Sequence, residues 1–461
     1  MFVGRENELQ TLQKLYNSGN SEFLVLYGRR RIGKTTLLKH FLSGKKAIFF
    51  TAVEDYPVSE SLKQFYERVS ERTGTVSFMS GFESWEKALM FIGEQAKNER
   101  LVLVIDEYPY LATAYKSISS IIQKLWDEYL KDTKLFIILC GSYMSFMENE
   151  VLAYKSPLYG RRTAQLKLEK LDYQEAGYFF KNYDKQDRLV AYSILDGIPE
   201  YLKKFSDTLT IEENIKNAIL DKSTYLYNEA NLLVRQELRE PQRYYSIIEA
   251  IALGNTKLGD IYTRTALDKA VINQYLKSLK ELNIVEREVP VTEHNPLKSK
   301  MGIYKLVDNY FKFWFRFVLP NMSELEENEV EYVFEKKVQP FLSEYMGYVF
   351  ENICMQFLKK LKKQNALPFR FSNIGRWWYK AEEIDIVAFD TENVLFGECK
   401  WQNRIIGVNE LNRLKDKAKF ANQGRWGREY FVLFSKSGFS SELVEQAKTD
   451  DDLLLFSAED M

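Results

Sequence analysis

The stretch LVLYGRRRIGKTTLLKHF, Leu24 to Phe41, runs from an apolar strand through a glycine-bounded loop into a helical pattern. The loop has the spacing G-x-x-x-x-G-K-[ST], in which glycines let backbone amides turn inward toward phosphate groups. The helix that follows presents its N-terminus, where the helix dipole favours an anion. This loop predicts a nucleotide site made by Gly28, Gly33, Lys34, Thr35 and Thr36.

Two side chains of the loop have expected roles beyond the backbone cradle. Lys34 should reach the β- and γ-phosphates, and Thr35 should offer its hydroxyl to Mg²⁺. Both the strand before the loop and the helix after it are present, as such a site requires. ATP and Mg²⁺ are therefore the expected ligands.

A second apolar run, LVLVIDEYPYL, supports this interpretation because it ends in two carboxylates, Asp106 and Glu107. Asp106 is expected to hold Mg²⁺, and Glu107 is expected to polarise the attacking water, as phosphoryl transfer to water requires. A third run, KLFIILCGSYMSFM, ends at Ser142, which could hydrogen-bond that water or the γ-phosphate. A serine that merely caps the loop is the alternative.

Arg161 and Arg162 follow in SPLYGRRTAQLKL, on a predicted exposed loop. One of them could act as an arginine finger, in cis or across a subunit interface, and add charge stabilisation to the transition state. A solvated basic loop explains them equally well.

Bulk composition excludes several classes of protein. The 461 residues suggest about three domains, and 64 Lys and Arg against 65 Asp and Glu create no global attraction to nucleic acid or membrane. Three separated cysteines and two histidines provide no zinc spacing, and unpaired thiols suit a reducing cytoplasm. The polar start and the short apolar runs predict neither a signal peptide nor a membrane span.

The order of patterns along the chain suggests its organisation. Short apolar runs alternating with helical stretches before about residue 168 predict buried parallel strands separated by helices. Amphipathic helices follow, and then Arg243 to Lys305 reads as helix, helix, helix and hairpin, the outline of a winged helix-turn-helix. The aromatic stretch NYFKFWFRFVLP reads as a docking segment and the acidic SELEENEVEY as a linker.

Six segments in order resemble the archaeal-type AAA+ ATPase family, close to the STAND and origin-recognition ATPases. They are FVGRENEL, YGRRRIGKTTLL, LVLVIDEYPYL, LCGSYMSFM, SPLYGRRT and DGIPEYL, within the first 310 residues or so. The resemblance implies that Phe2, Val3, Gly4 and Arg5 lie against the adenine or ribose. It also implies that Gly197, Ile198 and Pro199, in a helical lid, approach the nucleotide.

The C-terminal part has a second pattern, D-x12-E-x-K, formed by Asp385, Glu398 and Lys400 on two predicted strands. Two carboxylates and the carbonyl of Cys399 could hold Mg²⁺ while Lys400 orients or deprotonates water, and Glu351 could add a carboxylate. The pattern resembles the PD-(D/E)XK restriction-endonuclease-like domain often fused to ATPases of this branch. Ile384 stands where that pattern has its proline.

A DNA partner is expected from the winged-helix outline. Between Arg243 and Lys305, ten Lys and Arg stand against seven Asp and Glu, a modest surplus for a DNA reader. The side chains that could meet a major groove are Asn273, Gln274, Lys277 and Lys280. The alternative is an interdomain packing module that binds no DNA.

The sequence thus predicts a cytoplasmic, multidomain α/β protein with a P-loop NTPase of parallel strands, a helical lid, a winged helix and a nuclease-like α/β domain. The expected boundaries are 1–168, 169–240, 241–310, a linker at 311–340, and 341–461. The expected function is ATP binding and hydrolysis linked to DNA through a Mg²⁺-dependent nuclease-like site, with possible self-association across the ATP site. The alternative is an ATP-dependent signalling switch or scaffold whose nuclease-like domain is inactive.

Overall fold

The computed structural model describes residues 2–73, 81–237 and 241–461, which form two compact units. Unit 1 comprises residues 1–170 together with the short segment 198–200, and unit 2 comprises 171–197 and 201–461. We consider each unit by itself. Within the described ranges, every helix is too short or too polar to cross a membrane.

Unit 1 is built on a five-stranded sheet in the order β2-β3-β4-β1-β5, and every pair of neighbours is parallel. Its strands are β1 (Glu22–Tyr27), β2 (Ala47–Thr51), β3 (Leu101–Asp106), β4 (Leu135–Gly141) and β5 (Ala164–Lys167). The central strands β1, β3 and β4 are buried along their whole length. A strand covered on both faces needs a continuous apolar sequence, which is the pattern that predicted these strands.

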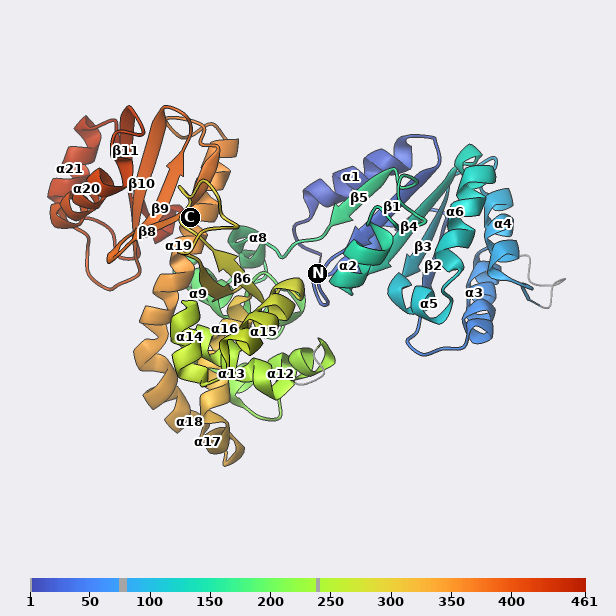
Figure 1. Cartoon of the computed structure of the whole chain (residues 1–461), viewed down its shortest axis with the longest axis horizontal. Helices are drawn as coiled ribbons and strands as arrows, with labels where there is room; N and C mark the ends of the chain where they lie inside the picture. The colour runs from blue at the N-terminus through green and yellow to red at the C-terminus, as the bar shows by residue number, and fades with distance from the viewer. Residues whose placement is uncertain (1, 74–80, 238–240) are drawn as a thin grey trace. The chain divides into compact units, whose positions relative to one another are not determined.

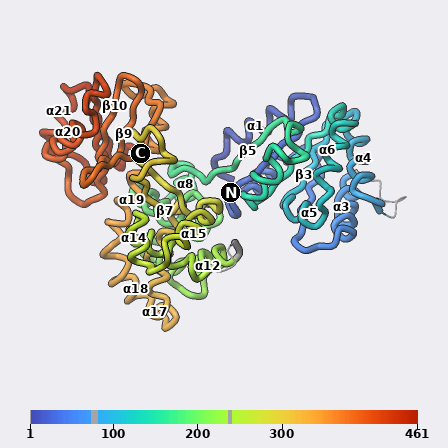
Figure 2. The backbone as a smooth tube through the Cα atoms, in the orientation of Figure 1, coloured from blue at the N-terminus to red at the C-terminus, as the bar shows by residue number. Residues whose placement is uncertain are grey.

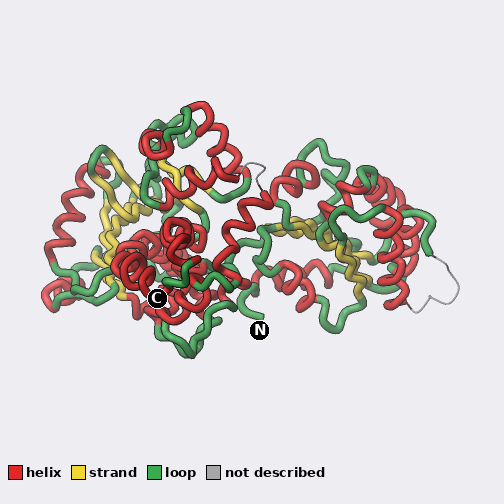
Figure 3. Tube along the Cα trace, turned by 90° about the horizontal axis from the view of Figure 1, so that it is seen from below, coloured by secondary structure: helices red, strands yellow, loops and turns green. Residues whose placement is uncertain are grey.

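Helices cover both faces of this sheet (Figures 1 and 3). One face packs against α1 (Glu6–Asn17) and α2 (Lys34–Phe41). The other face packs against α3 (Val58–Thr73), α4 (Trp85–Gln95), α5 (Tyr108–Ala114) and α6 (Ile118–Glu128). In α6 the buried residues Ile118, Ile122, Leu125 and Trp126 recur at helical spacing, so one stripe of the helix meets the sheet.

Unit 2 begins with the helices expected after the first sheet. They are α8 (Tyr173–Gly177), α9 (Lys185–Leu195), α11 (Ile211–Ile215) with the π-turn η3 (Lys216–Leu220), and α12 (Tyr225–Glu237). The short α10 (Pro199–Leu202) begins in the segment 198–200 that belongs to unit 1. Capping boxes begin α8 and α11. The side chains of Asp172 and Thr210 accept hydrogen bonds from the backbone amides of Glu175 and Glu213, and the carboxylates of Glu175 and Glu213 accept from the backbone amides of Asp172 and Thr210.

Three helices and a hairpin follow, labelled in Figures 1 and 2: α13 (Pro241–Ala252), α14 (Leu258–Thr265), α15 (Lys269–Glu281), β6 (Val285–Glu288) and β7 (Ile303–Leu306). The two strands pair antiparallel, with Val285 opposite Leu306. The order of elements is the one the sequence predicted. We call residues 241–306 the three-helix module.

The next segment differs from expectation. NYFKFWFRFVLP forms α16 (Asn309–Phe313) and the π-turn η4 (Trp314–Val318), and the acidic stretch forms α17 (Met322–Glu326) and α18 (Val330–Val333) in place of an open linker. Leu325 within the acidic stretch and Val333 directly after it are fully buried, so this stretch packs as helix.

The C-terminal sheet has the order β12-β11-β10-β9-β8 and is mixed, because β10, β11 and β12 are parallel while β8, β9 and β10 are antiparallel. Its strands are β8 (Asn373–Tyr379), β9 (Glu382–Phe389), β10 (Asn393–Lys400), β11 (Arg428–Ser435) and β12 (Leu453–Ser457). The helices of this part are α19 (Gln339–Lys363), α20 (Val408–Asn422) and α21 (Ser441–Thr449). The two strands predicted to carry Asp385 and Glu398 are β9 and β10.

Candidate functional site

The phosphate loop closes around the side chain of Lys34. The Lys34 Nζ donates to the carbonyl oxygens of Gly28 at 2.9 Å and of Arg29 at 2.8 Å, and burial lowers the pKa of this amine. The backbone turns through a left-handed conformation at Gly33, with φ of 94°, which favours glycine. A side chain at Gly28 would meet the carbonyl oxygen of Leu168 at 2.5 Å. The Lys34 amine is therefore held inside the curve of the loop before any phosphate binds.

Thr35 and Asp106 meet beside the loop. The Thr35 hydroxyl donates to Asp106 Oδ2 at 2.9 Å, and the Glu107 amide donates to Asp106 Oδ1 at 3.1 Å. These residues come from the first turn of α2 and the end of β3, two elements brought together because parallel strands end at the same edge of the sheet. A hydroxyl and a carboxylate are oxygen ligands of the kind Mg²⁺ prefers, so this pair fits the ion.

Glu107 and Ser142, which directly follow β3 and β4, lie at the same edge of the sheet. The Ser142 hydroxyl donates to Glu107 Oε1, and the Ser142 amide donates to Glu107 Oε2 at 3.3 Å. Glu107 has a left-handed φ of 52°, a conformation that costs a non-glycine residue energy and that recurs at functional sites. The structure therefore brings together Lys34, Thr35, Asp106, Glu107 and Ser142, five residues predicted from the sequence.

The N-terminal segment lies against the phosphate loop and α2. The guanidinium of Arg5 donates to the carbonyl oxygen of Ile32 at 3.2 Å, and the ring of Phe2 stacks on His40 at 4.1 Å. Val3 and Gly4 connect these two contacts, and Thr36 is exposed on α2. The predicted contact of this segment with adenine or ribose remains a prediction.

Pro199 reaches the same loop, because its Cγ lies 3.8 Å from the position that a Cβ would take on Gly33. Gly197 packs elsewhere, against Leu171: its carbonyl oxygen accepts the Leu171 amide at 2.9 Å. Of the three lid residues expected near the nucleotide, Pro199 is the one placed beside the loop by a direct contact.

Arg161 and Arg162 lie before β5, whose first residue Ala164 pairs with Leu24 in β1. Arg161 pairs with Asp127 at 2.9 Å. Arg162 donates to the carbonyl oxygen of Leu152 at 3.2 Å, and its charge acts on Tyr27, the residue before the phosphate loop. The role of either arginine as a finger, in cis or across a subunit interface, remains a prediction.

The C-terminal constellation lies where β9 and β10 run side by side. Asp385 Oδ2 accepts the Cys399 amide at 2.8 Å, and Glu398 pairs with Lys400 at 2.5 Å and with Lys417 at 3.2 Å. Burial and the neighbouring Glu398 raise the pKa of Asp385 to about 6. Asp385, Glu398 and Lys400 were expected to lie close together, and Lys417 of α20 joins them by its ion pair with Glu398.

Glu351 on α19 takes a different partner. Its carboxylate pairs with Arg376 of β8 at 3.0 Å, and burial raises its pKa to about 8. In the described part of the chain, no three His, Cys, Asp or Glu side chains gather with metal-binding geometry. A Mg²⁺ site here would therefore use Asp385, Glu398 and the Cys399 carbonyl, with Glu351 as an outer partner.

Two residues of this region were missed by the sequence. Lys417 belongs to RLKDKAK, a basic run that a solvated helix face explains as well as a site does, and Arg376 belongs to the unpredicted strand β8. Only the placement of α20 and β8 on the sheet gives these charges partners. The four residues proposed for a DNA groove, Asn273, Gln274, Lys277 and Lys280, are all exposed on α15.

Comparisons with known proteins agree with the N-terminal geometry. Residues 2–205 match a family model described as an ATPase domain predominantly from Archaea, and residues 314–419 match one described as archaeal and bacterial proteins of unknown function. The uncharacterized protein MJECL04 of Methanocaldococcus jannaschii is 36% identical over 465 residues, covering 100% of both chains.

Two solved structures are similar at low identity. The Walker-type ATPase paby2304 of Pyrococcus abyssi matches with a TM-score of 0.49 and 21% identity, over 68% of this chain and 96% of that one. The ORC2 protein of Aeropyrum pernix in ADPNP–ADP complexes matches with a TM-score of 0.44 and 15% identity, over 72% of this chain and 95% of that one.

Proposed function

The chain belongs to the same family as the M. jannaschii protein MJECL04 and carries an archaeal-type ATPase domain at residues 2–205, and from this premise we propose that it binds and hydrolyses ATP. The observation that carries the proposal is the hydrogen bond of 2.9 Å between Thr35 and Asp106. It joins the phosphate loop to the acidic strand end at the point where a nucleotide-bound Mg²⁺ needs oxygen ligands.

Each residue has a role that follows from its place. The loop amides and Lys34 would bind the phosphates, with the Lys34 amine exchanging two loop carbonyls for phosphate oxygens. Thr35 and Asp106 would hold Mg²⁺, which supplies positive charge to the β- and γ-phosphates. Glu107 would orient the attacking water and accept its proton, and Ser142 would hold the Glu107 carboxylate in place.

Nucleotide binding by single-site variants tests this proposal. Lys34→Ala should weaken the binding of a fluorescent ATP analogue by at least about tenfold, because it removes a charged contact to phosphate. Lys39→Ala is the matched control, since Lys39 is an exposed lysine five residues further along α2. Equal affinity in wild type and Lys34→Ala would overturn the assignment of the loop.

For unit 2 we propose a nuclease-like domain that acts on DNA with Mg²⁺. The support is the convergence of Asp385, Glu398 and Lys400 from two adjacent strands of a mixed sheet, with the raised pKa of Asp385 marking a buried, charge-rich site. The exposed α15 of the three-helix module would contact the duplex, and nucleotide state in unit 1 would govern access.

Cleavage of linear, circular and branched DNA, with and without Mg²⁺ and ATP, tests this second proposal. Asp385→Ala should abolish Mg²⁺-dependent cleavage, while Asp451→Asn, which changes an exposed carboxylate on the same unit, should not. Unchanged cleavage in Asp385→Ala would contradict the nuclease role.

An ATP-dependent switch or scaffold with an inactive nuclease-like domain is the competing function. One observation favours it: Glu398 is already paired with two lysines, and Asp385 already accepts a backbone amide. Under this alternative, wild-type protein bound to ATP cleaves no DNA in any of the conditions above. Self-association across the ATP site belongs to the same proposal, with Arg161 or Arg162 reaching a neighbour's nucleotide.

A further inference from the structure

Unit 2 contains a cavity of about 300 Å³ whose wall includes Glu351 and Arg376 but none of Asp385, Glu398 and Lys400. Its wall comes from the three-helix module, from the aromatic segment α16–η4, and from α19 with the β8–β9 hairpin. The volume lies at the lower end of the range for small-molecule sites. It can take a single nucleotide-sized ligand and is too small for a duplex.

The cavity has more positive charge than its own carboxylates neutralise. Arg316 pairs with Glu344 at 2.9 Å, and Arg376 pairs with Glu351 at 3.0 Å, so these four charges cancel within the wall. Four lysines also line the cavity, together with Glu382 and Glu383. Lys305 pairs with Glu286 and Glu288 at 3.2 Å, which leaves Lys257, Lys312 and Lys380. Within the described ranges, no carboxylate lies within 4.0 Å of the Nζ of any of these three.

Lys312 has two aromatic rings beside its amine and a lowered pKa. Its Nζ lies 5.0 Å from the ring centroid of Tyr348 and 5.9 Å from that of Tyr345. The carboxylate of Glu351 also acts on this amine but is paired directly with Arg376. Burial makes the charged state of a lysine costly, and Lys312 accordingly has a lowered pKa of about 8. An anion entering the cavity would supply the missing partner.

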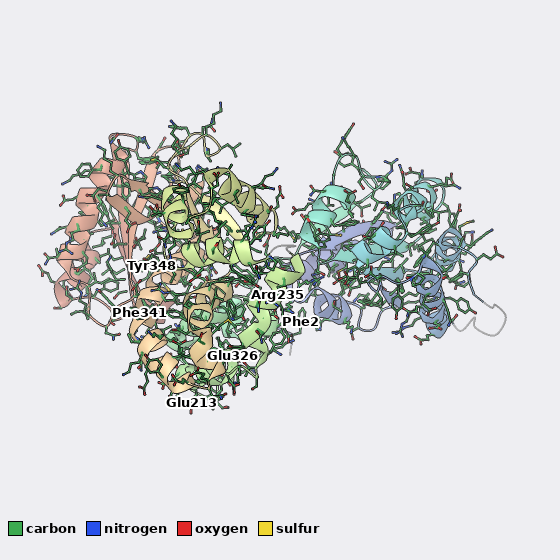
Figure 4. The ribbon with its side chains drawn as sticks, turned by 60° about the horizontal axis from the view of Figure 1, so that its bottom comes forward. Phe2, Glu213, Arg235, Glu326, Phe341 and Tyr348 are labelled. Carbon is green, nitrogen blue, oxygen red and sulfur yellow. The ribbon has the colours of Figure 1, made fainter. Side chains whose placement is uncertain are left out.

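The rest of the wall is aromatic and apolar. Trp378 is held in place by donation from its Nε1 to the carbonyl oxygen of Met301 at 3.1 Å, which ties β8 to the hairpin of the three-helix module. Tyr348, labelled on α19 in Figure 4, remains 45% exposed in spite of its position on the wall. Flat aromatic faces beside unpaired lysines are the combination that binds the bases and phosphates of nucleic-acid strands.

We propose that this cavity binds a nucleoside phosphate, with the phosphate against Lys312 and the cavity lysines Lys257 and Lys380 and the base against Trp378 or Tyr348. The site is separate from the phosphate loop of unit 1, so the chain has two places for nucleotide chemistry. Two sources provide this ligand: a free mononucleotide, and the terminal nucleotide of a single strand. The proposal requires neither cleavage of DNA nor hydrolysis of ATP.

Calorimetric titration of the full-length Lys34→Ala variant tests the site, because this substitution should weaken nucleotide binding at the phosphate loop and no competing nucleotide has to be added. The probes are dTMP, a 5′-phosphorylated single-stranded dT oligonucleotide, the same oligonucleotide without the phosphate, and inorganic phosphate. Binding of dTMP supports a free nucleotide as ligand, and binding of the phosphorylated strand alone supports a strand end. If phosphate binds as tightly as both, or if no probe binds at millimolar concentration, the proposal is wrong.

Three substitutions in this Lys34→Ala background connect the binding to the cavity. Lys312→Met should weaken the binding of the preferred probe at least about tenfold, as loss of a charged contact predicts. Lys380→Gln changes an exposed residue in the turn between β8 and β9, and it should weaken binding in the same direction. Lys336→Met is the matched control, because Lys336 pairs with Glu335 outside the cavity. Unchanged affinity in both Lys312→Met and Lys380→Gln would overturn the proposal.

Discussion

Glu107 shows how a single residue can be prepared for chemistry before the substrate arrives. Its left-handed backbone follows the last buried residue of β3 at once, and two hydrogen bonds from Ser142 hold its carboxylate in one orientation. Such a conformation persists when its surroundings over-determine it. Replacing the carboxylate by an uncharged amide of the same shape should therefore leave the position of the side chain unchanged.

Glu107→Gln should separate ATP binding from ATP hydrolysis. The amide keeps the shape and a hydrogen-bond acceptor for Ser142 but is a poor base, so we expect hydrolysis to fall at least about 100-fold while ATP affinity stays within about twofold. Glu128→Gln, at an exposed glutamate of α6, is the control. Phosphate release and ATP binding measured on the same preparations decide the matter, and hydrolysis retained by Glu107→Gln would assign the base elsewhere.

Lys312 should make the stability of unit 2 depend on pH. Burial lowers the pKa of its amine to about 8, against about 10.4 for a lysine in an unfolded chain. Between these values the unfolded chain binds more protons, so the contribution of Lys312 to the free energy of unfolding should rise from pH 8 to pH 10.

Chemical denaturation of wild type and Lys312→Met at both pH values measures this effect. Groups distant from Lys312 cancel in the difference, and Glu351 acts in the same direction, because loss of the nearby ammonium raises the pKa of its carboxyl further. The stability of wild type relative to the variant should increase with pH. A difference that stays constant or falls would mean that Lys312 is well solvated in the folded protein.

At the scale of elements, the parallel strands of unit 1 were predictable and the aromatic segment was not. A strand covered on both faces is apolar throughout, and β1, β3 and β4 have that sequence. In α16 and η4 most residues are buried, and the polar residues Asn309, Lys312 and Arg316 form only a narrow stripe at helical spacing. A short aromatic run of this kind is compatible with either element.

The candidate sites divide in the same way. The loop, Asp106 and Ser142 could be placed because each follows a recognisable strand, and parallel strands share one functional edge. The position of Arg161 depends on how β5 pairs with β1, and the partner of Glu398 depends on where α20 packs. Neither relation leaves a local signal in the sequence.

Trp314→Ala should destabilise unit 2 strongly. The side chain is fully buried in η4, and its Nε1 donates to the carbonyl oxygen of Tyr227 at 2.6 Å. Loss of a buried tryptophan costs about 3–5 kcal/mol. Tyr332→Ala, at a side chain that is 46% exposed, should cost less than about 1 kcal/mol. Urea denaturation of both variants checks this, and equal losses would contradict the packing of the aromatic segment.

At the scale of the whole molecule, the two units have separate cores and separate sites. An ATP analogue that binds unit 1 should raise the unfolding temperature of that unit alone. At a concentration of a hundred times its Kd, the stabilisation is about 2.7 kcal/mol.

Calorimetric melting with and without a non-hydrolysable ATP analogue and Mg²⁺ tests this expectation. We expect two transitions, of which one moves upward in wild type and neither moves in Lys34→Ala. An equal shift of both transitions would show that the units unfold together.

The most direct test of the central claim is steady-state phosphate release from ATP by wild type, Lys34→Ala and Lys39→Ala in the presence of Mg²⁺. If the loop from Gly28 to Thr35 is a catalytic phosphate site, wild type and Lys39→Ala release phosphate at equal rates and Lys34→Ala falls to background. Full phosphate release by Lys34→Ala would contradict the account.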